Sequence, residues 1–119
     1  MSVTPRKRRV LAAASTNATV LKTGGSHLRG VYGYTIDATP VYVKFYDKAI
    51  TPDENDTPVF VFVIPAATTA TLGSVNNVLL PDPGITFEEG LAYRIVTGIA
   101  DNDTGAVSAA EVIVNIAYD

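Results

Sequence analysis

The sequence of 119 residues contains no cysteine and no tryptophan, and its one histidine is His27. Without cysteine the chain cannot form disulfide bridges, thiolate nucleophiles or cysteine-ligated zinc sites. It also contains no nucleophile elbow, phosphate-binding loop or dinucleotide fingerprint. Because so few groups could perform acid–base or nucleophilic chemistry, we expect neither an enzyme nor a bound cofactor.

Helix-forming residues with straight side chains are scarce, because glutamine is absent and lysine and glutamate number four each. Valine, threonine and isoleucine, in contrast, number 15, 14 and 8. Their β-branched side chains are stiff and pack well on pleated sheets. The composition therefore predicts an all-β protein, and the length suffices for one domain with its own core.

Long hydrophobic runs are missing as well. No segment approaches the roughly 20 apolar residues of a membrane-spanning helix. The apolar segment that follows the basic start, residues 10–14, is shorter than the hydrophobic region of a secretory signal. We therefore expect a soluble protein without membrane contacts, made of a flexible basic N-terminal arm over residues 1–16 and a folded domain over residues 17–119.

Charge is distributed unevenly along the chain. Four of the nine basic residues are consecutive, and residues 10–119 then carry five basic against twelve acidic side chains. The acidic body should repel nucleic acid, so only the basic cluster could attract it. Three roles are open for this cluster: nucleic-acid binding, localisation, or a tether along an acidic protein surface. We favour the tether, and its candidate partner-binding residues are Arg6, Lys7, Arg8 and Arg9.

Apolar and polar side chains alternate with a period of two over most of the domain, which is typical of β-strands. Turn-forming residues separate these segments at short intervals. We therefore expect seven to eight strands in an antiparallel β-sandwich, either immunoglobulin-like or jelly-roll-like. Gly30 and Gly33, within the strand expected over residues 27–37, indicate a bulge or a close backbone approach. The other segments are residues 17–23, 40–48, 59–64, 75–80, 91–97 and 112–118.

Two of the expected strands have unusual faces. The segment Val59–Ile64 is apolar on both faces, so we expect it to be a central strand or to pack against a neighbouring subunit. In the segment 40–48, Tyr42, Lys44 and Tyr46 share the face opposite an aliphatic one. We interpret that face as half-exposed, and therefore as a candidate contact surface.

Two acidic clusters, residues 53–56 and 101–103, are the places to consider for a metal. Carboxylate and amide oxygens suit calcium, but neither cluster has the ligand spacing of an EF-hand loop. Aspartate and asparagine also favour tight turns, because their side chains bond to nearby backbone. We therefore expect turns without metal, with Asp101 and Asp103 capping backbone N–H groups.

Ser26 and His27 are adjacent in the sequence and would be the residues of a candidate catalytic dyad. Successive side chains of a strand point to opposite faces, so Ser26 and His27 cannot contact each other. We expect His27 to be an ordinary residue near the start of a strand.

Several segments resemble small virion proteins of tailed bacteriophages. The similarity lies in "NATVLKTGGSHLRGVYGYTIDATPVYVKFYDKA", in "DTPVFVFVIPA" and in "GITFEEGLAYRIVTGIADNDTGAVSAAEVIVNIAYD", and it covers residues 17–118. The shared features are a tyrosine–glycine–tyrosine strand, the segment "VKFYDKA", a proline-bounded apolar strand and a final "VIVN" strand. This frame is structural and contains no catalytic motif.

The resemblance implies a β-sandwich on the surface of a phage particle, made in the host cytoplasm. The implied role is a head decoration or cement protein that works as a homotrimer bound to the major capsid protein. Placement on the tail or baseplate stays open, and a third alternative is a carbohydrate-binding sandwich with exposed tyrosines such as Tyr32, Tyr34 or Tyr42. The basic arm lies outside the shared frame, and its docking role is inferred from its charge alone.

Overall fold

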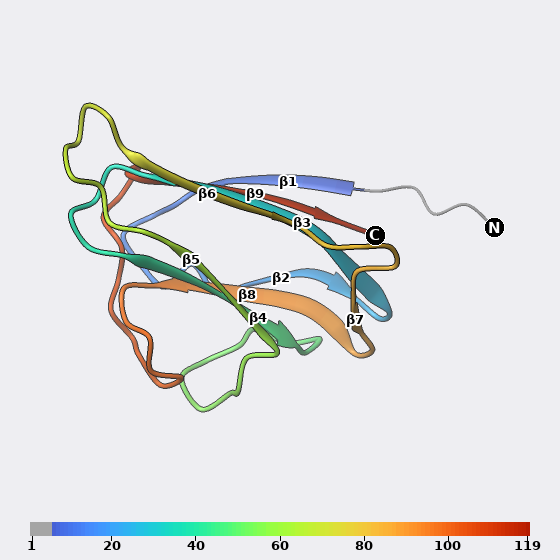
Figure 1. Ribbon diagram of the computed structural model, residues 1–119. Coiled ribbons are helices and arrows are strands. Elements are labelled where there is room, and N and C mark those ends of the chain that lie inside the picture. The colour runs from blue at the N-terminus through green and yellow to red at the C-terminus, as the bar shows by residue number, and fades with distance from the viewer. Residues whose placement is uncertain (1–5) are drawn as a thin grey trace.

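The computed structural model describes residues 6–119, which form nine strands and no helix. Two antiparallel sheets pack face to face, so the expected all-β sandwich is confirmed (Figure 1). The strands are β1 (Arg6–Leu11), β2 (Thr19–Thr23), β3 (Ser26–Thr35), β4 (Val41–Asp47), β5 (Phe60–Ile64), β6 (Ser74–Leu79), β7 (Ile85–Phe87), β8 (Gly90–Val96) and β9 (Val112–Tyr118).

The five-stranded sheet has the order β1-β9-β3-β6, and the short strand β7 also pairs with β3. The four-stranded sheet has the order β2-β8-β4-β5. In Figure 1 the five-stranded sheet is the upper layer and the four-stranded sheet the lower one. Consequently β1 and β9, the first and last strands of the described chain, are neighbours.

The core lies between the inner faces of the two sheets and contains mainly branched aliphatic side chains and phenylalanines. Gly33 leaves room for a side chain of the other sheet, because a Cβ added there would be 2.4 Å from Cδ1 of Ile64. The register of β3 against β9 shifts between Leu28 and Gly30, which is a β-bulge. The predicted bulge is confirmed beside Gly30, which also has the main-chain oxygen of Val78 close by, whereas the close neighbours of Gly33 are side chains and not backbone. Representative core residues are Leu28, Val43, Phe45, Ile64, Phe87, Ile95, Val114 and Ile116.

The flexible arm expected over residues 1–16 is wrong for residues 6–16, and residues 1–5 lie outside the described part. Strand β1 pairs with β9 from Arg6 opposite Tyr118 to Leu11 opposite Ile113. Val10 and Ala12 are buried in the core. Backbone pairing with β9 and the burial of Val10 and Ala12 order this segment. Its four cations do not oppose strand formation, because on an edge strand their charged groups stay in water.

Strand β5 is at the edge of the four-stranded sheet and is not the central strand that one interpretation required. Phe62 and Ile64 point into the core, whereas Val59, just before β5, and Val63 are exposed. One of its two apolar faces is therefore buried and the other is uncovered, so the alternative of a neighbouring subunit remains a prediction.

The carboxylates of Asp37 and Glu111 lie together where β3 ends beside the start of β9, since Ile36 N–H donates to the carbonyl of Glu111 at 3.1 Å. Burial, followed by hydrogen bonding to Glu111 and its negative charge, raises the pKa of Asp37 from 3.8 to about 6. A carboxyl whose pKa is higher in the folded state than in the unfolded state stabilises the fold at pH values below its unfolded-state pKa. This stabilisation is lost as the pH rises through its folded-state pKa.

We expect Asp37→Asn to stabilise the protein by about 1 kcal/mol at pH 7, after discounting the shift for solvent access. The free energy of unfolding of the wild type should fall between about pH 4 and pH 6, and the variant should lack this decline. Urea titrations across that window measure the effect, with Glu54→Gln in the exposed β4–β5 loop as control. A variant that kept the full decline would contradict the assignment.

Candidate interaction surfaces

The outer face of the four-stranded sheet is covered over β4 and β8 by the chain's own loops. Residues 97–111, which follow β8, supply main-chain acceptors to Lys44 and Arg94, and the loop after β4 buries Pro52. Lys44 is 0% and Tyr46 1% exposed, and Tyr42 is partly buried. The predicted half-exposed Tyr42–Lys44–Tyr46 contact surface is therefore wrong, because alternation separates the faces of a strand but does not reveal a loop that covers one of them.

Two buried cations lie opposite each other under these loops. Lys44 on β4 is the register partner of Arg94 on β8. Arg94 donates from Nη1 to the Tyr46 hydroxyl at 3.2 Å and from Nη2 to the Asp103 carbonyl at 2.6 Å, and Lys44 Nζ donates to the Ala100 carbonyl. Burial lowers the pKa of Lys44, the charge of Asp103 opposes this, and the adjacent Arg94 lowers it further. The pair fastens the β8–β9 loop to the sheet.

The acidic cluster 101–103 in that loop is a turn. Oδ1 of Asp103 accepts hydrogen bonds from the N–H groups of Gly98 at 3.1 Å and Gly105 at 2.8 Å. The capping role predicted for Asp103 is confirmed, whereas no side-chain hydrogen bond is found for Asp101 within residues 6–119. Across the same residues, no three metal-ligating side chains gather.

The outer face of the five-stranded sheet, in contrast, is uncovered over most of its area within residues 6–119, and we call it the open face; Gly73 of the β5–β6 loop lies against the Tyr34 ring at one end of it. Cross-strand register places its side chains in three rows that run across β1, β9, β3 and β6 in that order. The rows are Lys7, Ala117, Gly30, Leu79; Arg9, Asn115, Tyr32, Asn77; and Leu11, Ile113, Tyr34, Val75. This face is a place where another molecule can bind without moving part of the chain.

A groove of about 450 Å³ crosses the open face. Its floor follows the row of small residues Ala117 and Gly30, its ends are Lys7 and Leu79, and Tyr32 lines one side. Because neither floor residue has a side chain beyond a methyl group, the neighbouring rows stand above them and leave the depression.

The cluster Arg6–Arg9 lies on the free edge of the five-stranded sheet. Its four side chains are exposed and alternate in direction, so Lys7 and Arg9 belong to the open face while Arg6 and Arg8 point to the opposite side. None of the four forms an ion pair with another residue of the described chain. The cluster thus remains available to an anionic partner, as the tether interpretation requires.

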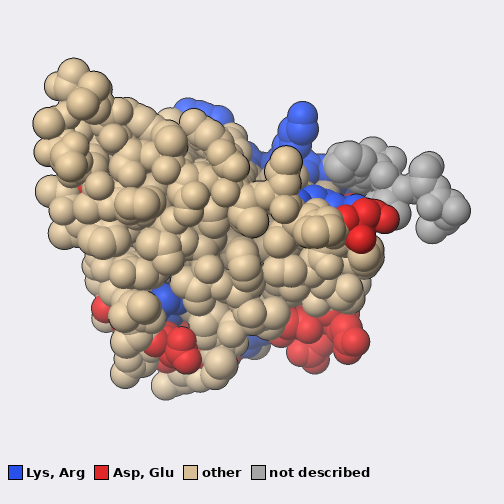
Figure 2. All heavy atoms as spheres, in the orientation of Figure 1, with Lys and Arg blue, Asp and Glu red and all other residues tan. Residues whose placement is uncertain are grey.

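A second surface is an uncharged wall, which we define as residues 57–81, comprising β5, β6 and the loop between them. These 25 consecutive residues contain no Asp, Glu, Lys or Arg. β5 and β6 face the viewer in Figure 1, and Figure 2 shows this side almost without charge, with acidic groups along the lower edge. Its exposed apolar side chains are Val59, Val63, Leu72, Val75 and Leu79.

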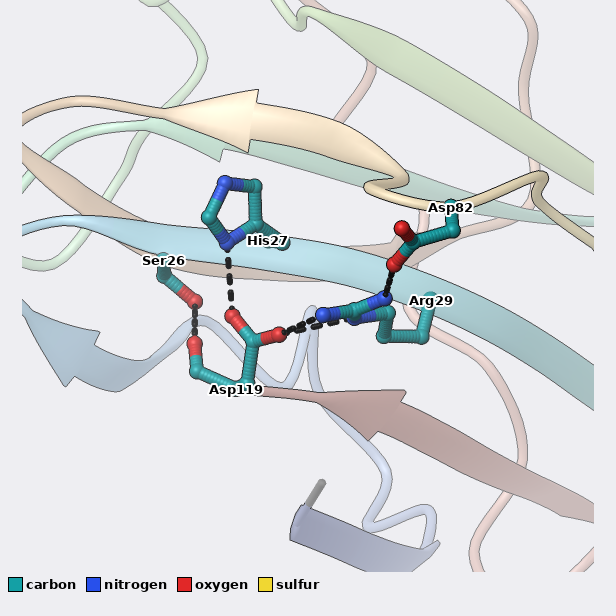
Figure 3. A network of polar contacts seen from close by, with 5 residues as sticks. All are labelled: Ser26, His27, Arg29, Asp82 and Asp119. Atoms are coloured by element: carbon teal, nitrogen blue, oxygen red, sulfur yellow. Dashed lines mark hydrogen bonds and ion pairs between the residues drawn. The ribbon is translucent and has the colours of Figure 1, made fainter. Parts of the chain in front are cut away.

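A polar network closes the end of the five-stranded sheet where β3 begins (Figure 3). Asp119 Oδ1 lies 2.7 Å from His27 Nδ1, and its Oδ2 accepts from Arg29 Nε at 2.7 Å. Arg29 also pairs with Asp82 at 2.5 Å. Burial alone would raise the pKa of Asp119, but the hydrogen bonds from His27 and Arg29 outweigh it and hold this pKa below 3.8.

The network contains serine, histidine and aspartate but not a catalytic triad. The Ser26 hydroxyl donates to the main-chain carbonyl of Asp119 at 2.5 Å, and Ser26 is buried. His27 bonds to the carboxylate of the same residue on the other side of the strand (Figure 3). Serine and histidine therefore never share a proton, and the network fastens β3 to the last described residue.

Comparisons of the chain with protein-family models, curated proteins and solved structures gave no match. Among the described residues there is also no helix of the length and hydrophobicity that crossing a bilayer requires. The function is therefore inferred from the open face, the uncharged wall, the charge of β1 and the resemblance of residues 17–118 to small virion proteins.

Proposed function

We propose that this chain is a non-enzymatic structural protein of a tailed-phage particle, a decoration or cement protein that binds the assembled head as a homo-oligomer. The observation that carries the proposal is the uncharged wall. Monomeric proteins seldom expose large contiguous apolar surfaces, and such surfaces mark contacts with other proteins. The resemblance to small virion proteins supplies the context in which copies of this chain pack together.

In this proposal the wall packs between copies, and the basic strand β1 supplies the attachment to an acidic shell surface. The exposed cations of β1 gain little from a single contact, because surface ion pairs contribute only about 0–1 kcal/mol each. Many copies on a lattice add these small gains, since each copy stabilises the assembled shell and not the free subunit. A decoration protein does not need chemistry, which agrees with the expectation of no enzyme.

Binding to purified heads tests the proposal directly. Labelled protein should sediment with heads, raise their tolerance of heat, and dissociate as salt screens the β1 cations. Association with isolated tails instead would favour the tail or baseplate alternative. Absence of binding to both particles would refute a virion role.

A charge placed in the uncharged wall should prevent copies of the chain from associating. Leu72→Lys, at a residue that is 75% exposed, should abolish self-association without changing the thermal midpoint, because an interface cannot bury an unpaired ammonium. The matched control is Ile99→Lys, at an equally exposed leucine-sized residue (74%) outside the wall. Sedimentation velocity measures the oligomer. A wild type that stays monomeric, or equal effects of the two variants, would remove the wall from the interface.

A further inference from the structure

The middle row of the open face has an arrangement that subunit packing does not require. Tyr32 on β3 lies directly between Asn115 on β9 and Asn77 on β6. Arg9 on β1 is the next residue of the row, opposite Asn115. Directly opposed side chains in antiparallel strands have Cβ atoms about 4.5–5.5 Å apart. Tyr32 is 44% exposed, and the register places one amide side chain on each side of it.

The two amides are available to a ligand. Asn77 and Asn115 are exposed, and neither side chain hydrogen-bonds to another group within residues 6–119. Each amide offers two donors and one acceptor. The groove over Ala117 and Gly30 runs alongside this row, and its volume of about 450 Å³ falls within the usual range of ligand sites, about 300–1,000 Å³.

We infer that this groove binds an acidic saccharide, a sugar chain whose rings carry carboxylates. The C–H face of a pyranose ring packs on the electron-rich face of Tyr32, as apolar C–H groups do on aromatic rings. Ring hydroxyls, which are donors and acceptors together, match the amides of Asn77 and Asn115. A ring carboxylate pairs with Lys7 at the end of the groove or with Arg9 at the end of the row.

Charge complementarity selects an acidic ligand. Lys7 and Arg9 point to the open face and have no ion-pair partner among the described residues. The Asp119 carboxylate, two residues beyond Ala117, is buried and already pairs with Arg29 and His27. The cations of the face are therefore not neutralised by the chain itself.

Two other occupants fit the observations less well. An apolar peptide would cover the amide groups of Asn77 and Asn115 without satisfying them, which costs free energy. Single-stranded nucleic acid would also stack on Tyr32, but it needs a groove of cations along its backbone, and this face offers two on an otherwise acidic body.

The experiment is an amide NMR titration of the full chain with a hyaluronan tetrasaccharide. Maltotetraose serves as the uncharged sugar, and polyglutamate and oligothymidylate as anions of other classes. We expect shifts confined to the groove, centred on Gly30, Tyr32 and Ala117, with a dissociation constant below about 1 mM. Maltotetraose should bind at least about tenfold more weakly, because it lacks the charge that pairs with Lys7.

Three variants separate the contributions. Tyr32→Ala should weaken hyaluronan binding about tenfold, the value of one aromatic contact. The double variant Lys7→Gln with Arg9→Gln should reduce hyaluronan binding to the maltotetraose level and leave maltotetraose binding unchanged. Ala117→Leu should block both sugars by filling the groove. Tyr34→Ala, in the next row of the same face, is the matched control and should bind like the wild type.

Several results would overturn the inference. These are no groove shifts with hyaluronan, equal or tighter binding of polyglutamate or oligothymidylate, or full binding by Tyr32→Ala. β6 belongs to both the uncharged wall and the open face, so shifts of its residues on raising the protein concentration alone are expected from packing of the wall. Shifts of Gly30 and Ala117 on raising the protein concentration alone would overturn the inference, because they would assign the groove to a second copy. The uncharged-wall variant Leu72→Lys should leave saccharide binding intact, so failure of the proposed function and failure of this inference are distinguishable.

Discussion

Arg94→Met should lower the free energy of unfolding by about 3 kcal/mol, the largest effect that we expect from a single substitution. Methionine retains most of the volume but removes the donors to the Tyr46 hydroxyl and the Asp103 carbonyl. Arg94 is 1% exposed, so water cannot replace the lost donors unless the β8–β9 loop detaches. Urea unfolding should show an earlier midpoint, and amide exchange in residues 97–105 should accelerate.

Lys44 lies opposite Arg94, and its substitution is compared with that of Arg94 by the change in the free energy of unfolding. Lys44→Met removes a like charge directly opposite Arg94 and the cost of burying an ammonium, and it loses one hydrogen bond to Ala100. These contributions oppose each other, so we expect a change below about 1 kcal/mol. Lys22→Met on edge strand β2 should be neutral. If Lys44→Met were as costly as Arg94→Met, the two cations would act as one unit and our separate roles for them would be wrong.

Asp119→Asn should cost about 2 kcal/mol at pH 7, because the buried carboxylate accepts charge-assisted hydrogen bonds from Arg29 and faces His27. Its side chain is 4% exposed. Asp82→Asn is the matched control, since Asp82 pairs with the same arginine but its side chain is 86% exposed. We expect that control to change stability by less than about 0.5 kcal/mol.

The effect of Asp119→Asn should depend on pH in a defined direction. The folded-state pKa of Asp119 lies below its ordinary value of 3.8. A carboxyl with a lowered folded pKa contributes stability that is present above the unfolded pKa and lost as pH falls through the folded one. The stability curves of wild type and variant should therefore stay parallel above about pH 5 and converge below pH 4. Parallel curves down to pH 2 would contradict the ion-pair assignment.

The sequence predicted the fold well because period-two alternation reports directly on which side chains face the core. Leu91, Tyr93 and Ile95, for example, face the core as alternation requires. Strand β1 was missed because "RKRRVL" carries its apolar residues only at one end, and its pairing depends on a partner more than 100 residues away. β7, with three residues, is too short to show a period of its own.

The surfaces were harder to predict than the core. Burial of Lys44 and Tyr46 depends on a loop that folds back over the sheet, and alternation does not report on such loops. Lys44 and Arg94 are each the single cation of an otherwise apolar segment. This was the signal in the sequence that the two charges lie together. The row of Asn115, Tyr32 and Asn77 depends on the register of three strands distant in sequence, which local patterns do not determine. The uncharged segment 57–81, in contrast, is visible in the sequence itself.

The adjacency of β1 and β9 has a consequence for biosynthesis. β9 lies between β1 and β3, and the contact between His27 and Asp119 joins residues 92 positions apart. A ribosome delivers the strands in order, so the five-stranded sheet lacks this inner strand until residues 112–118 have left the exit tunnel. Closing such a long loop is slow, and nascent chains meanwhile display the apolar β5 segment to one another. Newly made copies therefore complete this sheet only after residues 112–118 are available to pair with β1 and β3.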